Sequence, residues 1–267
     1  MRKEIGVVTS TYPNYNRAEA IEGISKAGFK YVELASAPDF FEHLPTPEKG
    51  VSKEVVDPVL EELKASGLTM QCIAGHTRLM KDDSVKNFKK VLDFAELAGV
   101  RFVTTDTGEV KNDDDQARFV KDIREIGDYA KSKDITVCLE MHGEWCNNGK
   151  IGASIIQKVD HPSIKLNYDT ANVIFFGDTR PEEDIKNAIP YMGYVHLKDH
   201  GSGKHKDWNF PALGEGVVGF DKIFDALQDF DGPGSVEIEF DGKERALEEI
   251  NEAVKKSYDF LIGKNML

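Results

Sequence analysis

Three acidic residues and one histidine stand near the ends of four consecutive apolar segments in the second half of the chain. The segments are TVCLEMH, IKLNYDT, YVHLKD and SVEIEF, and the residues are Glu140, Asp169, His196 and Glu239. Carboxylates that are buried together repel one another and lose their hydration unless a cation compensates them. Three oxygen ligands and one imidazole suit Mn²⁺, Mg²⁺, Co²⁺ or Zn²⁺, and the oxygen majority favours a harder ion such as Mn²⁺. We therefore predict that these residues bind one divalent metal ion per chain.

The alternation of residue types along each segment indicates which side chains point inward, because successive side chains of a strand point to opposite faces. In TVCLEMH the apolar residues 137, 139 and 141 would face outward, which leaves Glu140 facing inward. In SVEIEF both Glu237 and Glu239 face inward. We assign the metal ligand to Glu239, which is nearer the end of the segment, and a structural or supporting role to Glu237. The alternative is that the inward carboxylates form structural ion pairs with Lys165 or Lys198.

These segments belong to a chain in which amphipathic helices alternate with short apolar strands. ISKAGFKYVEL, LKASGLTMQCI and LAGVRFVTT each show a helix, a glycine that ends it and a strand. Period and turn signals predict eight strands, near 4–10, 31–37, 69–76, 102–108, 136–142, 164–170, 192–199 and 234–240. Helices are predicted near 16–27, 52–66, 84–98, 113–133, 152–159, 182–189, 220–230 and 244–262.

Eight alternating units predict an α/β protein with a (β/α)₈ TIM barrel that occupies residues 1–267 as a single domain. The length of 267 residues is typical of this architecture. An open, doubly wound sheet is the alternative, but no G-x-G-x-x-G turn follows the first strand. In a barrel, the four polar strand ends would meet at the catalytic end.

Composition and charge exclude several classes of partner. The chain has 34 Lys and Arg against 47 Asp and Glu, and its net charge of −13 would repel a nucleic acid backbone. No export signal opens the chain, and no apolar run approaches the roughly 20 residues of a membrane span, so we expect a soluble protein with no membrane partner. Cys72, Cys138 and Cys146 lack a C-x-x-C spacing, which favours a reducing cytoplasm over a disulfide framework.

With these motifs the sequence resembles the xylose isomerase-like barrel superfamily, which contains sugar isomerases and epimerases, inosose dehydratases and apurinic endonucleases. The resemblance covers nearly the whole chain and rests on CLEMH, NYDTAN, VHLKD, LGEG and VEIEF. For members similar to tagatose epimerase, it implies that the four residues bind the metal ion and that Glu140 and Glu239 also act as acid and base. Many relatives have a histidine where this chain has Asn172, which can form hydrogen bonds but cannot titrate. The resemblance further implies a homodimer or a homotetramer, the oligomeric states usual in this superfamily.

The resemblance implies a metal-dependent isomerase or epimerase that acts on a small keto-sugar or polyol ketone. A metal ion on the ketone oxygen and a neighbouring hydroxyl would stabilise the enediolate that forms when an adjacent C–H proton is removed. Two glutamates could then remove and return the proton. If a β-hydroxyl leaves from the enediolate, the protein is instead a keto-sugar or inosose dehydratase, a lyase. The acidic charge disfavours the third reading, an apurinic endonuclease, and a catalytically silent sugar-binding barrel is the fourth.

Six further residues are candidates for substrate binding because they lie at predicted strand ends or in the long segment 200–219: His76, Glu109, His142, Lys198, Trp208 and Glu215. Trp208 would form an apolar wall for a sugar ring, and Glu215 would bind a hydroxyl group. Each candidate has a structural alternative, which is a packed histidine, a salt-bridged lysine or a residue of a solvated loop.

Overall fold

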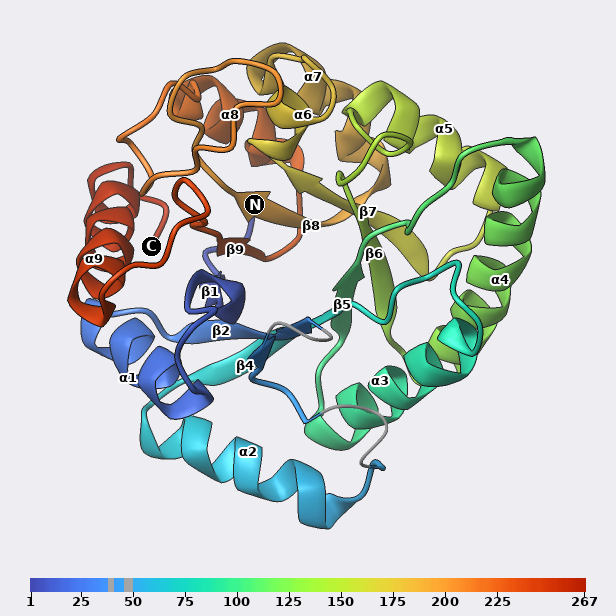
Figure 1. The fold of residues 1–267 in the computed structure, drawn as a ribbon, viewed down its shortest axis with the longest axis horizontal. Helices are drawn as coiled ribbons and strands as arrows, with labels where there is room; N and C mark the ends of the chain where they lie inside the picture. Colours follow the sequence, from blue (N-terminus) through green and yellow to red (C-terminus); the bar gives the residue numbers. More distant parts are fainter. Residues whose placement is uncertain (38–40, 46–49) are drawn as a thin grey trace.

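The parallel strands of the protein, seen in a computed structural model, close into a barrel surrounded by helices (Figure 1). The structure describes residues 1–37, 41–45 and 50–267. Strand β1 pairs in parallel with both β2 and β9, and this pairing closes the ring. The predicted TIM barrel is confirmed. Its strands are β1 (Ile5–Val8), β2 (Tyr31–Ala37), β4 (Thr69–Gly75), β5 (Phe102–Thr105), β6 (Thr136–Glu140), β7 (Ile164–Asp169), β8 (Met192–Leu197) and β9 (Gly234–Val236).

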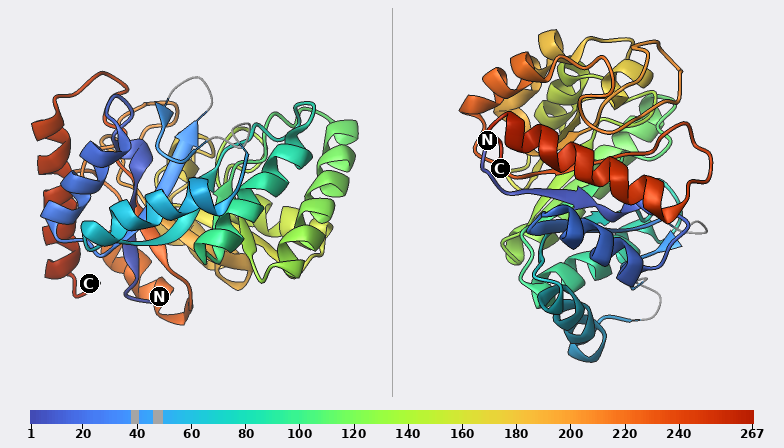
Figure 2. Two further views of the ribbon diagram at one scale, coloured as in Figure 1. Left: turned by 90° about the horizontal axis from the view of Figure 1, so that it is seen from below. Right: turned by 90° about the vertical axis from the view of Figure 1, so that its left-hand side faces the viewer.

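Helices follow the strands and form the outer layer of the barrel, as the side views in Figure 2 show. The main helices are α1 (Arg17–Ala27), α2 (Lys53–Ala65), α3 (Ser84–Ala98), α4 (Asp113–Ser132), α5 (Gly149–Val159), α7 (Pro181–Ala188), α8 (Phe220–Ala226) and α9 (Leu247–Gly263). A short helix, α6 (Asn172–Phe175), precedes α7, and a short strand, β3 (Phe41–Glu42), pairs antiparallel with β2. Both chain termini lie at one end of the barrel (Figure 2).

Local sequence signals set several of these helix boundaries. The side chains of Asn16, Asn112 and Asn148 each accept a hydrogen bond from a backbone N–H in the first turn of α1, α4 and α5 respectively. Helix α1 ends at Gly28, which has a φ of 113° in the left-handed region. A Cβ atom at this position would lie 2.7 Å from the ring of Tyr258. Glycine is therefore required here both by the backbone and by the close approach of α9.

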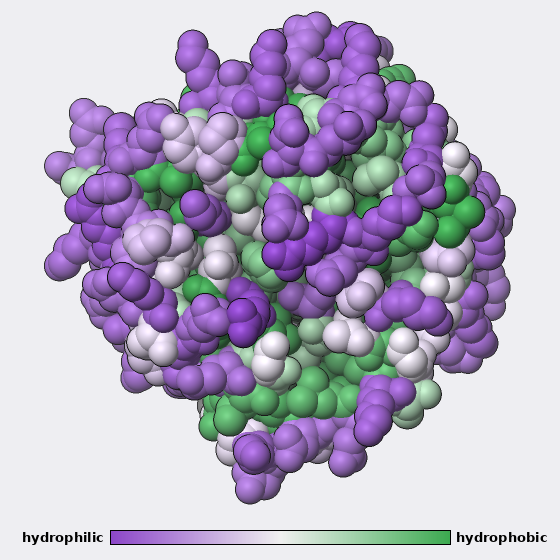
Figure 3. Space-filling view, turned by 180° about the vertical axis from the view of Figure 1, so that it is seen from behind, coloured by the Kyte–Doolittle hydropathy of each residue, from purple (hydrophilic) through white to green (hydrophobic). Residues whose placement is uncertain are grey.

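The side chains of the strands alternate between the helical layer and the barrel interior, as the sequence predicts. Leu139, Leu166 and Leu197 face outward and are fully buried beneath the helices. Polar side chains at the alternate positions, such as Asn167 and His196, are buried inside the barrel. Hydrophilic residues cover most of the outer edge of the face shown in Figure 3. Within the described residues, no helix has the length and apolar character needed to cross a membrane.

The last strand is shorter than predicted: β9 ends at Val236, whereas the prediction extended it to residue 240. Beyond it the chain turns away to pair with the long segment that follows β8. The backbone N–H of Phe210 donates to the carbonyl of Phe240 at 2.6 Å, and the N–H of Phe240 donates to the carbonyl of Phe210 at 2.8 Å. Phe240 itself has a φ of 51°. Glu237 and Glu239 therefore follow the strand instead of lying within it.

Candidate metal centre

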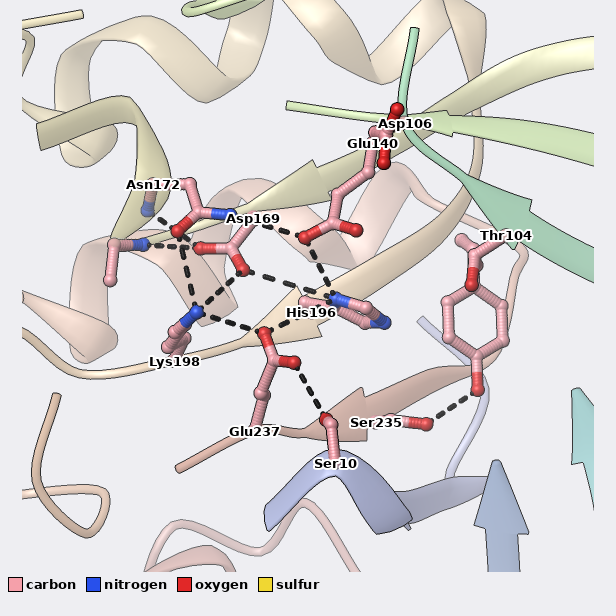
Figure 4. A network of polar contacts seen from close by, with 12 residues as sticks. Ser10, Thr104, Asp106, Glu140, Asp169, Asn172, His196, Lys198, Ser235 and Glu237 are labelled. Carbon is pink, nitrogen blue, oxygen red and sulfur yellow. Dashed lines mark hydrogen bonds and ion pairs between the residues drawn. The ribbon is translucent and has the colours of Figure 1, made fainter. Parts of the chain in front are cut away.

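Four ionisable side chains from β6, β7, β8 and the residue after β9 converge inside the barrel (Figure 4). Glu140 and Asp169 are the last residues of β6 and β7, His196 lies in β8, and Glu237 directly follows β9. All four residues are buried, and one candidate ligand atom from each lies within 4.8 Å of the others. Neighbouring parallel strands thus bring together residues that are widely separated in the sequence.

The fourth member of this group is Glu237, whereas the sequence predicted Glu239 for this place. The carboxylate of Glu239 bonds to the Nζ atom of Lys198 at 2.5 Å. Its side chain is 27% exposed, whereas that of Glu237 is 9% exposed. Glu239 therefore lies nearer to solvent than Glu237, and it borders a cavity that Trp208 also lines.

Backbone amides fix the orientation of Asp169. Its Oδ1 atom accepts hydrogen bonds from the backbone N–H groups of Ala171 at 2.8 Å and Asn172 at 2.7 Å. The side chain of Asn172 donates to Oε1 of Glu140 at 3.1 Å. Asn172 therefore contacts Asp169 through its backbone N–H and Glu140 through its side chain. A histidine at this position would have added a titratable group.

His196 presents its two ring nitrogens to different surroundings. Its Nδ1 atom lies 3.5 Å from Glu140, 3.9 Å from Asp169 and 3.8 Å from Glu237. Its Nε2 atom lies 3.1 Å from the carboxylate of Glu33 on the opposite edge of the ring. Among the described residues, neither His196 Nδ1 nor Asp169 Oδ2 has a hydrogen-bond partner, although both atoms are buried. A divalent cation between them would satisfy both atoms, so these residues fit a metal ion.

Lys198 supplies a buried positive charge at the edge of the group. Its Nζ atom donates to Glu237 at 3.0 Å and to Asn172 Oδ1 at 3.3 Å, in addition to its bond with Glu239. It also lies 4.3 Å from the centre of the Phe210 ring. The salt-bridged role considered for Lys198 is therefore observed, and this role places the ammonium group next to the candidate ligands.

The pKa values of the grouped carboxylates diverge because their surroundings differ. Burial raises the pKa of Asp169 to about 7, and Glu237 and Glu140 add to the shift while Lys198 opposes it. Burial also acts on Glu237, but the positive charges of Lys198 and His196 outweigh it and lower the pKa of that carboxyl to about 2. The centre thus concentrates negative charge in a place that favours uptake of a cation.

His76, Asp106 and His142 lie at the barrel mouth on the side of β4 to β6. Nδ1 of His76 is 3.2 Å from Oδ2 of Asp106. Asp106 and His142 line a cavity of about 810 Å³, which Glu109 also borders. Glu109 is exposed and forms an ion pair with Lys111 at 2.7 Å. Three predicted substrate-binding residues, His76, Glu109 and His142, are therefore near the mouth, with Glu109 at its solvent edge.

The two candidates from the long segment 200–219 have different positions. Trp208 is 40% exposed and packs edge-on against Phe210, with ring centroids 5.1 Å apart. It lines a second cavity of about 370 Å³ together with Glu239. Glu215 instead forms an ion pair with Lys256 of α9 at 2.8 Å on the outer surface. The structure therefore does not bring Glu215 to the group.

The buried carboxylate of Asp199 anchors the segment 200–219. Its carboxylate accepts hydrogen bonds from the backbone N–H groups of His200, Gly214, Gly216 and Val218, at distances from 2.8 to 3.1 Å. A Cβ atom at Gly216 would lie 2.3 Å from Oδ1 of Asp199. Since one buried carboxylate holds both ends of the segment, the loop has a defined path over the barrel mouth.

Sequence reasoning missed three polar residues beside the group, namely Glu33, Ser10 and Asp106. Ser10 donates to Oε1 of Glu237 at 2.9 Å. Glu33 is fully buried and interrupts the apolar strand YVELASA at an inward position. Glu33 and Asp106 stand at inward positions of β2 and directly after β5, so the alternation of residue types that indicates Glu140 indicates them as well.

Comparisons with known proteins agree with this architecture. The family model for the xylose isomerase-like TIM barrel matches residues 21–262. A search of curated proteins gave no significant match. Similar solved structures include the probable 3-DHS dehydratase AsbF from Bacillus anthracis, with 16% identity over 97% of this chain and 98% of that chain and a TM-score of 0.76.

Two further solved structures cover nearly the whole chain. D-psicose 3-epimerase from Clostridium cellulolyticum H10 has 18% identity over 96% of this chain and 97% of that chain, with a TM-score of 0.74. A xylose isomerase-like TIM barrel protein from Mycobacterium smegmatis in complex with magnesium has 17% identity over 97% of both chains, with a TM-score of 0.75. At these identities the likeness shows a shared fold.

Proposed function

Because the chain belongs to the xylose isomerase-like TIM barrel family, we propose that it is a divalent-metal-dependent isomerase or epimerase of keto-sugars. The observation that carries this proposal is the buried group of Glu140, Asp169, His196 and Glu237, in which two polar atoms have no hydrogen-bond partner in the part of the chain that the structure describes. Mn²⁺ suits its three carboxylates and one imidazole, and Mg²⁺ suits them as well. The solved epimerases of similar fold support the choice of a sugar as substrate.

A divalent ion held by these four residues would stabilise the negative charge that develops on a ketone oxygen during proton removal. The proton itself moves between carbon and the carboxylates of this chain. Glu140 and Glu237 both approach the Nδ1 edge of the His196 ring (Figure 4), at 3.5 and 3.8 Å from the Nδ1 atom. We assign the removal of the proton to one of these glutamates and its return to the other.

Neighbouring groups prepare the two glutamates for this work. Ser10 and Lys198 hold the two oxygens of Glu237, and Asn172 holds one oxygen of Glu140. Asn172 cannot exchange a proton at its side chain, so the proton transfers rest on the carboxylates. We assign the binding of substrate hydroxyl groups to His76 and His142, which lie near the barrel mouth.

A dehydratase that acts on a keto-sugar or an inosose is the second candidate. The fold is shared with a probable 3-DHS dehydratase, and the buried ammonium of Lys198 provides a proton donor beside the carboxylates for a leaving hydroxyl group. An apurinic endonuclease is less compatible with the net charge of −13, which disfavours approach to a DNA backbone.

The test is an NMR screen of keto-sugars and inososes in heavy water with added Mn²⁺ and, in parallel, Mg²⁺. An isomerase or epimerase incorporates solvent deuterium at carbon in the recovered or converted sugar. A dehydratase instead yields a product with a new double bond. Cleavage of abasic duplex DNA, with no turnover of any sugar, would refute the proposal.

A further inference from the structure

Glu33 is a buried carboxylate that the proposed proton transfers do not use. It lies on β2, which is not a neighbour of β8 in the sheet, and its side chain is fully buried. Its Oε1 atom accepts a hydrogen bond from Oγ1 of Thr104 on β5 at 2.6 Å. Its Oε2 atom lies 3.1 Å from Nε2 of His196. The carboxylate therefore connects the first half of the barrel to a candidate metal ligand in the second half.

This contact selects one form of the His196 ring. A neutral imidazole carries its proton on one nitrogen only, and an ionised carboxylate can only accept a hydrogen bond. With Glu33 at Nε2, the proton belongs on Nε2, and the lone pair of Nδ1 then faces Glu140, Asp169 and Glu237. Within residues 1–37, 41–45 and 50–267, Nδ1 is the ring nitrogen without a hydrogen-bond partner, as expected for an atom whose partner is a cation.

We propose that Glu33 is a positioning residue that holds the His196 imidazole with its proton on Nε2 and its Nδ1 lone pair directed at the metal. The role rests on the proposed function, because it requires that the group bind a divalent ion. A carboxylate at the second nitrogen of a ligating histidine fixes the direction of the ring and makes the ligand more basic.

The position of Glu33 distinguishes this role from that of a fifth ligand. Its Oε2 atom contacts the edge of the ring that is turned away from the other carboxylates, and Thr104 holds its Oε1 atom. The side chain is anchored at both oxygens before any ion binds. It therefore acts on the ion through the imidazole.

The experiment compares Glu33→Gln and Glu33→Leu with the full-length wild-type protein. Affinity for Mn²⁺ is measured from the free-ion signal in electron paramagnetic resonance. Glutamine keeps an acceptor of similar size but loses the charge, so we expect binding about 10- to 100-fold weaker. Leucine also removes the acceptor, and we expect a larger loss. Tyr168→Phe is the control, because it removes a buried hydrogen bond to Asp184 on the outer side of β7 and leaves Mn²⁺ affinity unchanged.

A second measurement reports on the ring itself. In ¹⁵N-labelled protein loaded with diamagnetic Mg²⁺, His196 should carry its proton on Nε2 in the wild type, and the signal of this N–H should shift in Glu33→Gln. Mn²⁺ affinity in Glu33→Gln equal to that of the wild type would overturn the role of Glu33 alone. A wild-type protein that binds no divalent ion would instead overturn the proposed function, and with it the inference. A lower melting temperature without a change in affinity would show that Glu33 only stabilises the fold.

Discussion

The two halves of the barrel line its upper interior with different kinds of side chain. On β1, β2 and β4, the residues Val8, Ala35 and Ala74 form a small buried apolar cluster. At the ends of β6 to β9, the corresponding region holds the ionisable group of the candidate metal centre. An ion needs several ligands within a few ångströms. Neighbouring strands supply them readily, because adjacent strands of a sheet lie close together. The small apolar residues Val8, Ala35 and Ala74 offer no ligand for an ion.

The largest expected effect tests which residues of the polar half perform the chemistry. Glu140→Gln and Glu237→Gln should each lower kcat by about 1000-fold, because each removes a group to which we assign a proton transfer. Glu239→Gln is the matched comparison and should lower kcat by less than about 10-fold, in keeping with a partly exposed group at the mouth. The assay is steady-state turnover of the keto-sugar identified by NMR. A greater loss in Glu239→Gln than in Glu237→Gln would assign the proton transfer to Glu239.

Removal of the buried Lys198 ammonium group should destabilise the polar half of the barrel, and a metal ion should reverse part of this loss. Lys198→Met leaves Glu237 and Glu239 without their cation and should lower the free energy of unfolding by about 3 kcal/mol in EDTA. Mn²⁺ should recover part of this loss, since it supplies positive charge to the same carboxylates.

The matched variant in the apolar half is Ala74→Leu, which overfills the cluster and should cost about 1–3 kcal/mol. Mn²⁺ should leave this difference from the wild type unchanged. Urea unfolding of both variants and the wild type, each with Mn²⁺ and in EDTA, measures these differences. Equal recovery of both variants by Mn²⁺ would show that the ion does not act at the polar half.

Metal addition to the wild-type protein should have a slightly smaller effect. Mn²⁺ at 100 times its dissociation constant should raise the free energy of unfolding by about 2.7 kcal/mol, because it binds only the folded chain. Asp169→Asn, which removes the charge of a candidate ligand, should lose most of this gain at the same Mn²⁺ concentration. Calorimetric unfolding with and without EDTA measures the gain. The same gain in the Asp169→Asn variant would place the ion elsewhere.

The smallest effect concerns the charged pair that the first half contributes to the barrel mouth. Partial burial lowers the pKa of His76, but the hydrogen bond and charge of Asp106 outweigh it and raise this pKa to about 9, above the ordinary value of 6.5. The same pair holds the pKa of Asp106 below its usual range, although burial opposes this. A raised histidine pKa stabilises the folded state at pH values below 6.5, and this stabilisation is lost as pH rises through about 9.

Asp106→Asn should therefore lower the free energy of unfolding by about 1 kcal/mol near pH 6. The difference from the wild type should shrink toward zero above pH 9, where His76 is neutral in the folded protein. Urea unfolding at several pH values gives this comparison. A difference that stays constant from pH 6 to pH 10 would mean that the pair contributes packing and no charge interaction.

The sequence predicted the polar half well where regular strands continue to the site. Glu140, Asp169 and His196 follow from alternation, because inward and outward residue types alternate over the last positions of β6, β7 and β8 up to these residues. The choice between Glu237 and Glu239 could not be made in this way. It depends on where β9 ends, and β9 ends early because Phe210 pairs with Phe240. A contact between residues 30 positions apart leaves no local signal in SVEIEF.

The contribution of the first half was harder to predict for a different reason. Glu33 belongs to a strand that is otherwise apolar or small, and its partner His196 lies 163 residues away. One polar residue in such a strand does not reveal which strand across the barrel it will contact. The pairing of Glu215 with Lys256 of α9 likewise depends on how the final helix packs. The alternation of residue types predicts that a strand residue such as Glu33 faces inward, and the closure of the barrel determines which partner it contacts.

The four hydrogen bonds that backbone N–H groups donate to Asp199 have a consequence for the energetics of ligand binding. A loop that becomes ordered only when a ligand arrives loses conformational entropy at that moment, and the loss weakens the affinity. In this protein the chain from His200 to Val218 is tied at both ends to one carboxylate during folding. Much of its ordering entropy is therefore lost before any substrate is encountered. If Trp208 contacts the substrate as predicted, little further ordering of this segment is needed when the substrate binds.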